Sequence, residues 1–171
     1  GDPANRRVCR GGMHHGWRGR RPRSASPSSR QGLTGIVVTT RILTGWHNLI
    51  SADCGAAAAI GAFDGVHRGH QAVIASAREA AHRLNAPLAV VSFIPHPRRW
   101  FQPDAAPFRL MTPGQMARAL SPLGVERLHL LPFDAEMAAM SDGEFARRVL
   151  ADGLGLRHAA VGFDFTYGKG R

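Results

Sequence analysis

The sequence predicts an α/β domain built on a doubly wound parallel sheet, with helices on both faces of the sheet. Two observations lead to this prediction. Short apolar runs typical of buried strands alternate along the chain with segments whose apolar residues recur every three or four positions, as in amphipathic helices. Two of the helical segments also begin with capping boxes, which mark helix starts. Strands that alternate with helices in this way tend to pair in parallel.

The first half of the expected domain contains two strands around one long helix. The first strand is the run from Ala56 to Ile60, which consists of small and β-branched residues bounded by glycines. The second strand covers Leu88 to Phe93 and ends where Pro95 and Pro97 remove backbone donors. The helix between them starts at about Gly69, and its apolar stripe consists of Val73, Ile74, Ala77, Ala80, Ala81 and Leu84.

Capping boxes open the two helices expected in the second half. Thr112-Pro-Gly-Gln115 has Pro at the first helical position, and Ser141-Asp-Gly-Glu144 starts a helix that we expect to stop at Gly153 or Gly155. Further strands are expected over Arg127–Leu131 and His158–Gly162.

The segment Ile60-Gly-Ala-Phe-Asp-Gly-Val-His-Arg-Gly-His70 lies where the first strand passes into the long helix. Gly61 and Gly65 permit a tight turn there. His67 and His70 therefore fall at a helix N-terminus, where backbone N–H groups and the helix dipole favour a phosphate. Each imidazole can donate a hydrogen bond to a phosphate oxygen and gain positive character as charge builds on phosphorus. The segment predicts a nucleotide-transfer site.

The residues alone leave other interpretations of this segment open. Gly69 removes a side chain that could block a nucleotide, whereas Asp64 could either anchor the turn or hold a metal ion. The two histidines could also lie on a surface loop or form a metal pair three residues apart. Zinc is disfavoured because no nearby cysteine supplies a further ligand and His96 lies on a separate loop.

Two later segments carry further candidate residues. Phe93-Ile-Pro-His-Pro97 holds His96 at the C-terminal end of a strand, where ligands of open α/β sheets collect. Taken alone, however, Pro-His-Pro is better explained as a rigid turn. Val161-Gly-Phe-Asp-Phe-Thr-Tyr-Gly-Lys-Gly-Arg171 sets the carboxylate of Asp164 beside aromatic rings. That arrangement suits a flat, hydrogen-bonding ligand, but composition alone favours a hairpin with core aromatics and a solvated basic end.

Taken in order, these three segments resemble those of the bacterial bifunctional riboflavin kinase/FMN adenylyltransferases, the FAD synthases, in their N-terminal adenylyltransferase module. The Gly-Val before His67 is the narrower signature, because the wider nucleotidyltransferase superfamily shares only the Phe-Asp and His-x-Gly-His parts. The resemblance runs from about Thr39 to the last residue, with Ala62 where Asn is common and Tyr167 where Phe is usual. It implies a Rossmann-like nucleotidyltransferase fold.

The resemblance also implies an activity, the transfer of AMP from ATP to FMN to give FAD and pyrophosphate, with Mg²⁺ accompanying ATP. It implies no particular metal ligand. Related transferases that use pantetheine phosphate, nicotinate mononucleotide or CTP are disfavoured by the Gly-Val and Pro-His-Pro features. The residues implied as catalytic are His67 and His70; those implied to bind ATP are Gly61, Phe63, Asp64, Gly69 and Asp164; those implied to bind the flavin are Phe93, Pro95, His96, Pro97, Phe165 and Tyr167.

The positive charge of the chain is concentrated at its start. Residues 1 to 30 hold eight arginines and one acid, whereas the remainder has fourteen basic and eleven acidic residues. We therefore expect residues 1–36 to be a disordered Arg-rich tail, interpreted as a non-native leader rather than a targeting peptide or a nucleic-acid-binding arm. Residues 37–171 are expected to form the adenylyltransferase domain, incomplete at its C-terminus and without the riboflavin kinase module.

An incomplete domain raises an alternative function, that of an inactive flavin- or nucleotide-binding fragment. No apolar run approaches the roughly 20 residues that span a membrane. We therefore expect a cytoplasmic protein whose partners are the small molecules FMN and ATP, with no membrane and no nucleic acid among them.

Overall fold

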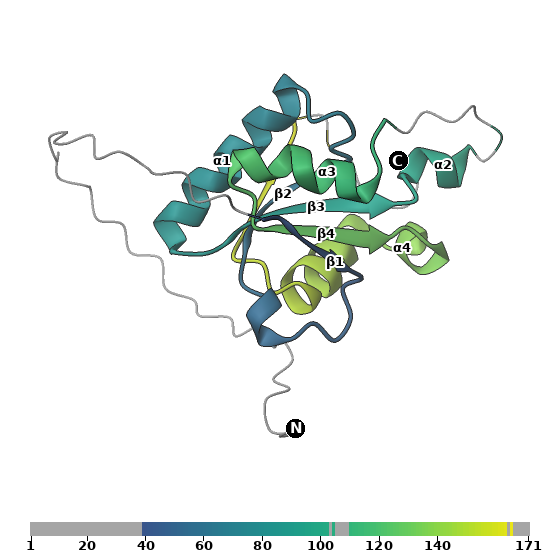
Figure 1. Ribbon diagram of the computed structural model, residues 1–171. Helices are drawn as coiled ribbons and strands as arrows, with labels where there is room; N and C mark the ends of the chain where they lie inside the picture. The colour runs from purple at the N-terminus through teal and green to yellow at the C-terminus, as the bar shows by residue number, and fades with distance from the viewer. Residues whose placement is uncertain (1–38, 103, 105–109, 164, 166–171) are drawn as a thin grey trace, which may run out of the picture.

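A computed structural model of the chain describes residues 39–102, 104, 110–163 and 165. The expected arginine-rich tail, Asp164 and Tyr167 lie outside these described residues. Five strands form one all-parallel sheet in the order β1-β4-β3-β2-β5, and helices cover both of its faces (Figure 1). The prediction of an α/β fold with a doubly wound parallel sheet is confirmed.

The elements follow one another as strands and helices in alternation. The strands are β1 (Arg41–Thr44), β2 (Ala57–Ile60), β3 (Leu88–Ile94), β4 (Arg127–Pro132) and β5 (His158–Val161). The helices are η2 (Ser51–Asp53), α1 (Arg68–Leu84), α2 (Pro97–Phe101), α3 (Pro113–Leu120), η3 (Ser121–Leu123), α4 (Ala135–Ala139), α5 (Asp142–Glu144) and η4 (Phe145–Gly153). Among the described residues, no helix combines the length and the apolar character needed to cross a membrane.

The four strands that the sequence predicts begin and end within one residue of the observed strands. The sequence analysis missed β1, which lies at the edge of the sheet and has three exposed residues out of four. An edge strand of this kind buries little surface, so its apolar pattern is weak. The short helices α2 and α4 were also missed, because five residues give too little sequence to show a helical period.

The path of the chain through the sheet reverses at β2. Strands β2, β3 and β4 are neighbours in chain order, whereas β5 returns to the other side of β2. Ala58 of β2 therefore lies between Ala89 of β3 and Ala159 of β5. In doubly wound sheets, ligands bind in the crevice at the C-terminal ends of the strands where the order reverses. In this chain that point follows Ile60, where the histidine segment begins.

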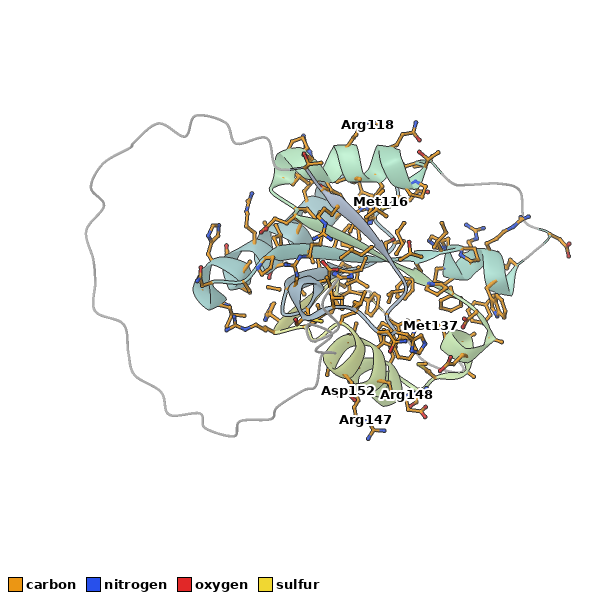
Figure 2. The ribbon with its side chains drawn as sticks, turned by 60° about the horizontal axis from the view of Figure 1, so that its bottom comes forward. Met116, Arg118, Met137, Arg147, Arg148 and Asp152 are labelled. Atoms are coloured by element: carbon orange, nitrogen blue, oxygen red, sulfur yellow. The ribbon has the colours of Figure 1, made fainter. Side chains whose placement is uncertain are left out.

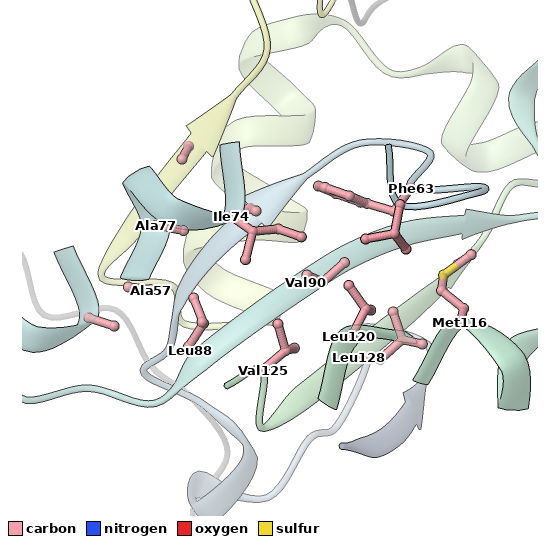
Figure 3. Close-up of a cluster of buried hydrophobic side chains, with 14 of the residues drawn as sticks. Ala57, Phe63, Ile74, Ala77, Leu88, Val90, Met116, Leu120, Val125 and Leu128 are labelled. Carbon is pink, nitrogen blue, oxygen red and sulfur yellow. The ribbon is translucent and has the colours of Figure 1, made fainter. Parts of the chain in front are cut away.

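One face of the sheet packs against α1 and α3 (Figure 3). Ala57 and Ala59 of β2 point to this face together with Val90 of β3, because side chains two positions apart in a strand share a face. Ile74 and Ala77 of α1 pack in the same buried cluster. The small side chains of β2 allow α1 to pack closely against the sheet.

The other face of the sheet packs against α4 and η4. Ala58 and Ile60, the alternate residues of β2, belong to this second cluster. Figure 2 shows Met116 of α3 and Met137 of α4 on opposite sides of the sheet, and each is buried in the cluster of its own side. The sheet is thus apolar on both faces, as the nearly continuous apolar strands predicted.

Both predicted capping boxes are present. The Thr112 hydroxyl accepts the N–H of Gln115, whose side chain accepts the N–H of Thr112. Ser141 and Glu144 make the same reciprocal pair. The second box starts α5, which continues as the wider π-helix η4 and ends at Gly153, one of the two expected stops.

Candidate active site

Two histidines lie at the N-terminus of α1. His67 is the N-cap residue, and its Nδ1 accepts a hydrogen bond from the backbone N–H of His70 across 3.4 Å. The two imidazole rings stack, with centroids 3.6 Å apart and an angle of 22° between their planes. Because Nδ1 of His67 accepts, Nε2 carries the proton of the neutral ring and can donate to a ligand. Two imidazoles thus stand at a helix end that favours anions.

Gly69, between the two histidines, makes room for the His67 ring. A Cβ at this position would lie 3.2 Å from both Cε1 and Nδ1 of His67. Carbon atoms in ordinary contact are about 3.5–4 Å apart, so a side chain here would push the ring away from the helix. From the sequence, Gly69 was expected to leave space for a nucleotide. In the structure, Gly69 also leaves space for the His67 ring.

The turn that precedes His67, residues 61–66, is called the histidine turn below, and three of its residues have a left-handed backbone. Phe63, Gly65 and Val66 have φ angles of +43°, +85° and +42°. Such a conformation costs a residue other than glycine on the order of 1–3 kcal/mol, and it is least expected for a β-branched residue such as Val66. The Phe63 ring is buried and lies with its centroid 5.0 Å from that of His70. The turn is therefore kept in place by the structure around it.

Hydrogen bonds from two neighbouring elements fasten this turn. The buried Ser92 of β3 donates its hydroxyl to the carbonyl oxygen of Ala62 across 3.0 Å. Gln71 of α1 donates its side-chain N–H to the carbonyl oxygen of Val66 across 3.1 Å. Neither Ser92 nor Gln71 was singled out from the sequence, because each acts on backbone rather than on a recognisable motif.

Asp64 fastens the turn to a distant part of the chain. Its Oδ2 accepts the backbone N–H of Leu110 across 2.8 Å, and its Oδ1 accepts that of Met111 across 2.9 Å. Of the two roles that the sequence left open for Asp64, the structure shows the anchoring contacts. In the part of the chain that the structure describes, no group of three or more His, Cys, Asp or Glu side chains is placed to hold a metal ion.

The Pro-His-Pro loop follows β3, next to the histidine turn. His96 is the N-cap of α2, and its Nδ1 accepts the backbone N–H of Arg98 across 3.1 Å. Burial lowers the pKa of His96, the Asp64 carboxylate opposes this shift, and the Arg98 guanidinium adds to it. The ring is therefore neutral at pH 7, with the proton on Nε2, and can donate one hydrogen bond there.

A cavity of about 950 Å³ opens at the C-terminal ends of the central strands. Its lining brings the imidazoles of His67 and His70 together with the neutral ring of His96. The aromatic side chains in the lining are those of Phe63, Phe93, Phe101, Phe133, Phe163 and Phe165. A volume of this size accommodates a ligand as large as a nucleotide, and the lining offers both hydrogen-bond donors and apolar rings.

The structure brings most of the predicted site residues to this cavity. Those in its lining are Gly61, Phe63, His67, Gly69, His70, Phe93, His96, Pro97 and Phe165. Asp64 and Pro95 belong to the two loops beside it but are not part of the lining. Asp164 and Tyr167 lie outside the described residues.

Several lining residues were not assigned to the site from the sequence, among them Phe101, Phe133 and Met137. Phe133 directly follows β4 and contacts two other aromatic rings of the lining. Its ring centroid lies 5.9 Å from that of Phe93 and 5.9 Å from that of Phe101. Its position at the C-terminal end of a parallel strand is the signal that drew attention to His96, and it could have identified Phe133 as well. Phe101 and Met137 lie on five-residue helices that gave no sequence signal.

Comparison with known proteins gives consistent matches over the described domain. The family model for FAD synthetase matches residues 49–171. A bifunctional riboflavin kinase/FMN adenylyltransferase of Pseudomonas fluorescens is 46% identical over 131 residues, which are 77% of this chain and 42% of the relative. The protein of the same name from Bacillus subtilis is 41% identical over 112 residues, which are 65% of this chain and 35% of the relative. The one from Escherichia coli K12 is 37% identical over 132 residues, which are 77% of this chain and 42% of the relative. The chain thus spans about two fifths of the length of these relatives.

A solved structure supports the fold. The crystal structure described as a macrolide-efflux protein from Streptococcus pneumoniae superimposes with a TM-score of 0.59 at 26% sequence identity, covering 74% of this chain and 42% of that one. The parallel sheet, the histidine turn at its reversal point and the family match over most of the chain agree with one another. On these grounds the chain belongs to the FAD synthetase family.

Proposed function

We propose that this chain is the FMN adenylyltransferase domain of a bifunctional riboflavin kinase/FAD synthase and transfers AMP from ATP to FMN. The observation that carries the proposal is the composition of one cavity, which joins a pair of stacked imidazoles at a helix N-terminus with a group of aromatic rings. The first feature suits phosphates and the second suits a flat ring system. FMN and ATP together present both, and the relatives above carry the name of this activity.

The proposed reaction is an in-line displacement at phosphorus. An oxygen of the FMN phosphate attacks the α-phosphorus of ATP, and the bond from that phosphorus to the oxygen bridging to the β-phosphate breaks. Pyrophosphate leaves with the bonding electron pair, and FAD is formed. The attacking phosphate is already ionised at neutral pH, so no base has to remove a proton. Catalysis of such a reaction rests on positioning and on stabilising the developing charge.

We assign the charge-stabilising role to His67 and His70. Both rings lie at the N-terminal end of α1, so they can donate hydrogen bonds to phosphate oxygens whose charge grows in the transition state. Gly61, Phe63, Asp64 and Gly69 are proposed to shape the ATP site, and so is Asp164. The remaining assignments, to the flavin, are Phe93, Pro95, His96, Pro97, Phe165 and Tyr167.

Mg²⁺ enters this proposal as part of the ATP substrate. Mg²⁺ commonly retains several waters and binds through substrate phosphates with one or two protein carboxylates. Asp64, the carboxylate within the histidine turn, uses both oxygens to accept backbone N–H groups. The described residues fit a metal that arrives on the nucleotide better than one held by the protein alone.

The test is FAD formation by the purified full chain with FMN and Mg-ATP, followed by chromatography. We expect FAD from the wild type and a fall of about 10²–10³-fold in kcat for His67→Ala. His82→Ala is the matched control, because His82 is an exposed histidine in the last turn of the same helix. An undiminished rate in both His67→Ala and His70→Ala would contradict the assignment. If the wild type binds FMN but forms no FAD, the alternative of an inactive flavin-binding fragment is correct.

A further inference from the structure

We propose that Asp64 is a positioning residue that keeps the His67 and His70 rings in register for adenylyl transfer by fastening the histidine turn to Leu110 and Met111. The inference rests on the proposed function for its kinetic part. Its structural part, the fastening itself, stands on the hydrogen bonds of the chain and can be tested without any substrate.

The contact between Asp64 and residues 110–111, which precede α3, consists of two short hydrogen bonds to one carboxylate. One carboxylate accepts two backbone N–H groups from consecutive residues, at 2.8 and 2.9 Å. Hydrogen bonds to an ionised acceptor are about twice as strong as neutral ones. The segment also lies directly against the turn, because a Cβ at Gly65 would be 3.2 Å from Cδ1 of Leu110. A loop-to-loop contact of this kind joins parts of the chain 46 and 47 residues apart.

The turn needs such fastening because its backbone is unfavourable. Phe63 and Val66 both hold positive φ angles, and conformations of this kind persist when the surroundings over-determine them. Ser92 holds the start of the turn from β3, and Gln71 holds its end from α1. Asp64 supplies the third attachment, on the side of α3, and it is the only charged group among these three. Loss of its two bonds frees the middle of the turn.

A change in the backbone of the histidine turn would directly alter the position of His67, because Val66 precedes His67 in the chain. In the part of the chain that the structure describes, the His67 ring is held by a 3.4 Å hydrogen bond from the N–H of His70 and by stacking on the His70 ring. A rotation at Val66 would alter both contacts. Displacements of about 1 Å in a reacting group can lower a rate by about 10²-fold.

The fastening is measured first, by amide hydrogen exchange at Leu110 and Met111 in the absence of nucleotide and flavin. We expect Asp64→Ala to speed exchange at both amides by about tenfold or more, because two charge-assisted hydrogen bonds are lost. Asp64→Asn keeps one acceptor oxygen and places an NH₂ group opposite the other donor, so one amide should stay protected. The Asn variant is nearly the same size as Asp and serves if the Ala variant does not fold.

The positioning role is measured on the same proteins. We expect Asp64→Ala to lower kcat for FAD formation by about 10–10²-fold while FMN affinity stays within about twofold, and to shift the imidazole NMR signals of His67 and His70 as their stacking changes. Asp142→Asn is the control, since Asp142 also accepts a backbone N–H, from Gly143 at 2.8 Å, but on exposed α5. It should leave all of these measurements unchanged.

Three results would overturn the proposal. Unchanged exchange at Leu110 and Met111 in Asp64→Ala would mean that the fastening is not made in solution. Faster exchange with unchanged histidine signals would mean that it does not position the rings. A variant that only requires more Mg²⁺, with both amides still protected, would make Asp64 a metal ligand instead. If the wild type forms no FAD, the proposed function fails, while the exchange and NMR measurements still decide whether Asp64 holds the rings in place.

Discussion

The histidine turn after β2 and the Pro-His-Pro loop after β3 use the same local device for different ends. In each, a histidine at the C-terminal end of a parallel strand becomes the N-cap of the next helix, and its Nδ1 accepts a backbone N–H. The helices differ: α1 has 17 residues and α2 has five. A long helix presents a well-developed dipole and a full first turn of N–H groups, which favour phosphate, whereas one turn offers little of either.

The surroundings of the two loops differ as well. His67 is exposed and stacks on a second imidazole, so two donors lie together at the end of the cavity that we propose to bind phosphate. His96 is partly buried, which lowers its pKa. Phe93, near the end of the strand before it, packs its ring against Phe133. A neutral donor beside aromatic rings suits a flat heterocycle better than a phosphate. The capping role of a histidine therefore does not fix its chemistry; the length of the helix and the neighbours of the ring do.

The largest expected effect tests whether His67 matters as a cap or as an imidazole. Asn is also a good N-cap, so His67→Asn should retain helix α1 while removing the ring. We expect kcat for FAD formation to fall about 10²–10³-fold in His67→Asn, as in His67→Ala, with FMN binding retained. Turnover and flavin titration on both variants separate the two roles. A His67→Asn enzyme with near wild-type kcat would show that capping alone is sufficient.

A third histidine differs from both, because it lies in the middle of a strand rather than beyond its end. His129 of β4 is fully buried, and among the described residues neither of its ring nitrogens has a hydrogen-bond partner. Burial lowers its pKa to about 4, the Arg127 charge adds to the shift, and Asp53 opposes it. Between pH 6.5 and about 4 the unfolded chain therefore binds the additional proton, and the folded state loses stability as the pH falls through this window.

Replacing His129 should remove this acid sensitivity. We expect the wild type to lose up to about 3 kcal/mol of its free energy of unfolding between pH 7 and pH 4 through this group, and His129→Leu to lose correspondingly less. At pH 7 the variant should be as stable as the wild type or more so, because a buried polar ring without partners is replaced by an apolar side chain. Urea unfolding at both pH values measures the difference. Parallel losses in the two proteins would contradict the role given to His129.

The next effect concerns the end of the cavity that we propose to bind the flavin. His96→Asn keeps an acceptor for the Arg98 N–H but removes the imidazole. We expect the KM for FMN to rise about tenfold, the equivalent of one lost hydrogen bond, with kcat changed much less than in the His67 variants. Steady-state kinetics with varied FMN measures this split. A large fall in kcat with unchanged KM for FMN would move His96 to the phosphate end.

The smallest effect comes from a cap that has no place in the cavity. The Ser141 hydroxyl accepts the N–H of Glu144 at the start of α5 and donates to the Glu144 carboxylate, so Ser141→Ala removes the capping bond and this exposed side-chain bond. We expect the free energy of unfolding to fall by about 1 kcal/mol and kcat to stay at the wild-type value. Thermal or urea unfolding beside the FAD assay provides both numbers. A change in kcat would link α5 to the site.

The sequence was most informative where structure depends on near neighbours. The strands over residues 57–60 and 88–94, both capping boxes and the placement of His67 at a strand-to-helix junction follow from patterns a few residues long. It was least informative at the edge of the sheet and on one-turn helices, where β1 and Phe101 have no periodic signal.

The class of fold, the order of the main elements and the position of the histidine segment at the C-terminal end of β2 could be predicted from sequence, because hydrophobic period, caps and turn residues act locally. Three features appear in the folded chain alone: Asp64 binds Leu110 and Met111, Phe133 joins the aromatic lining, and His129 is buried with no hydrogen-bond partner among the described residues. These contacts depend on the order of strands in the sheet, which brings together residues dozens of positions apart. Such an encounter leaves no pattern within either segment.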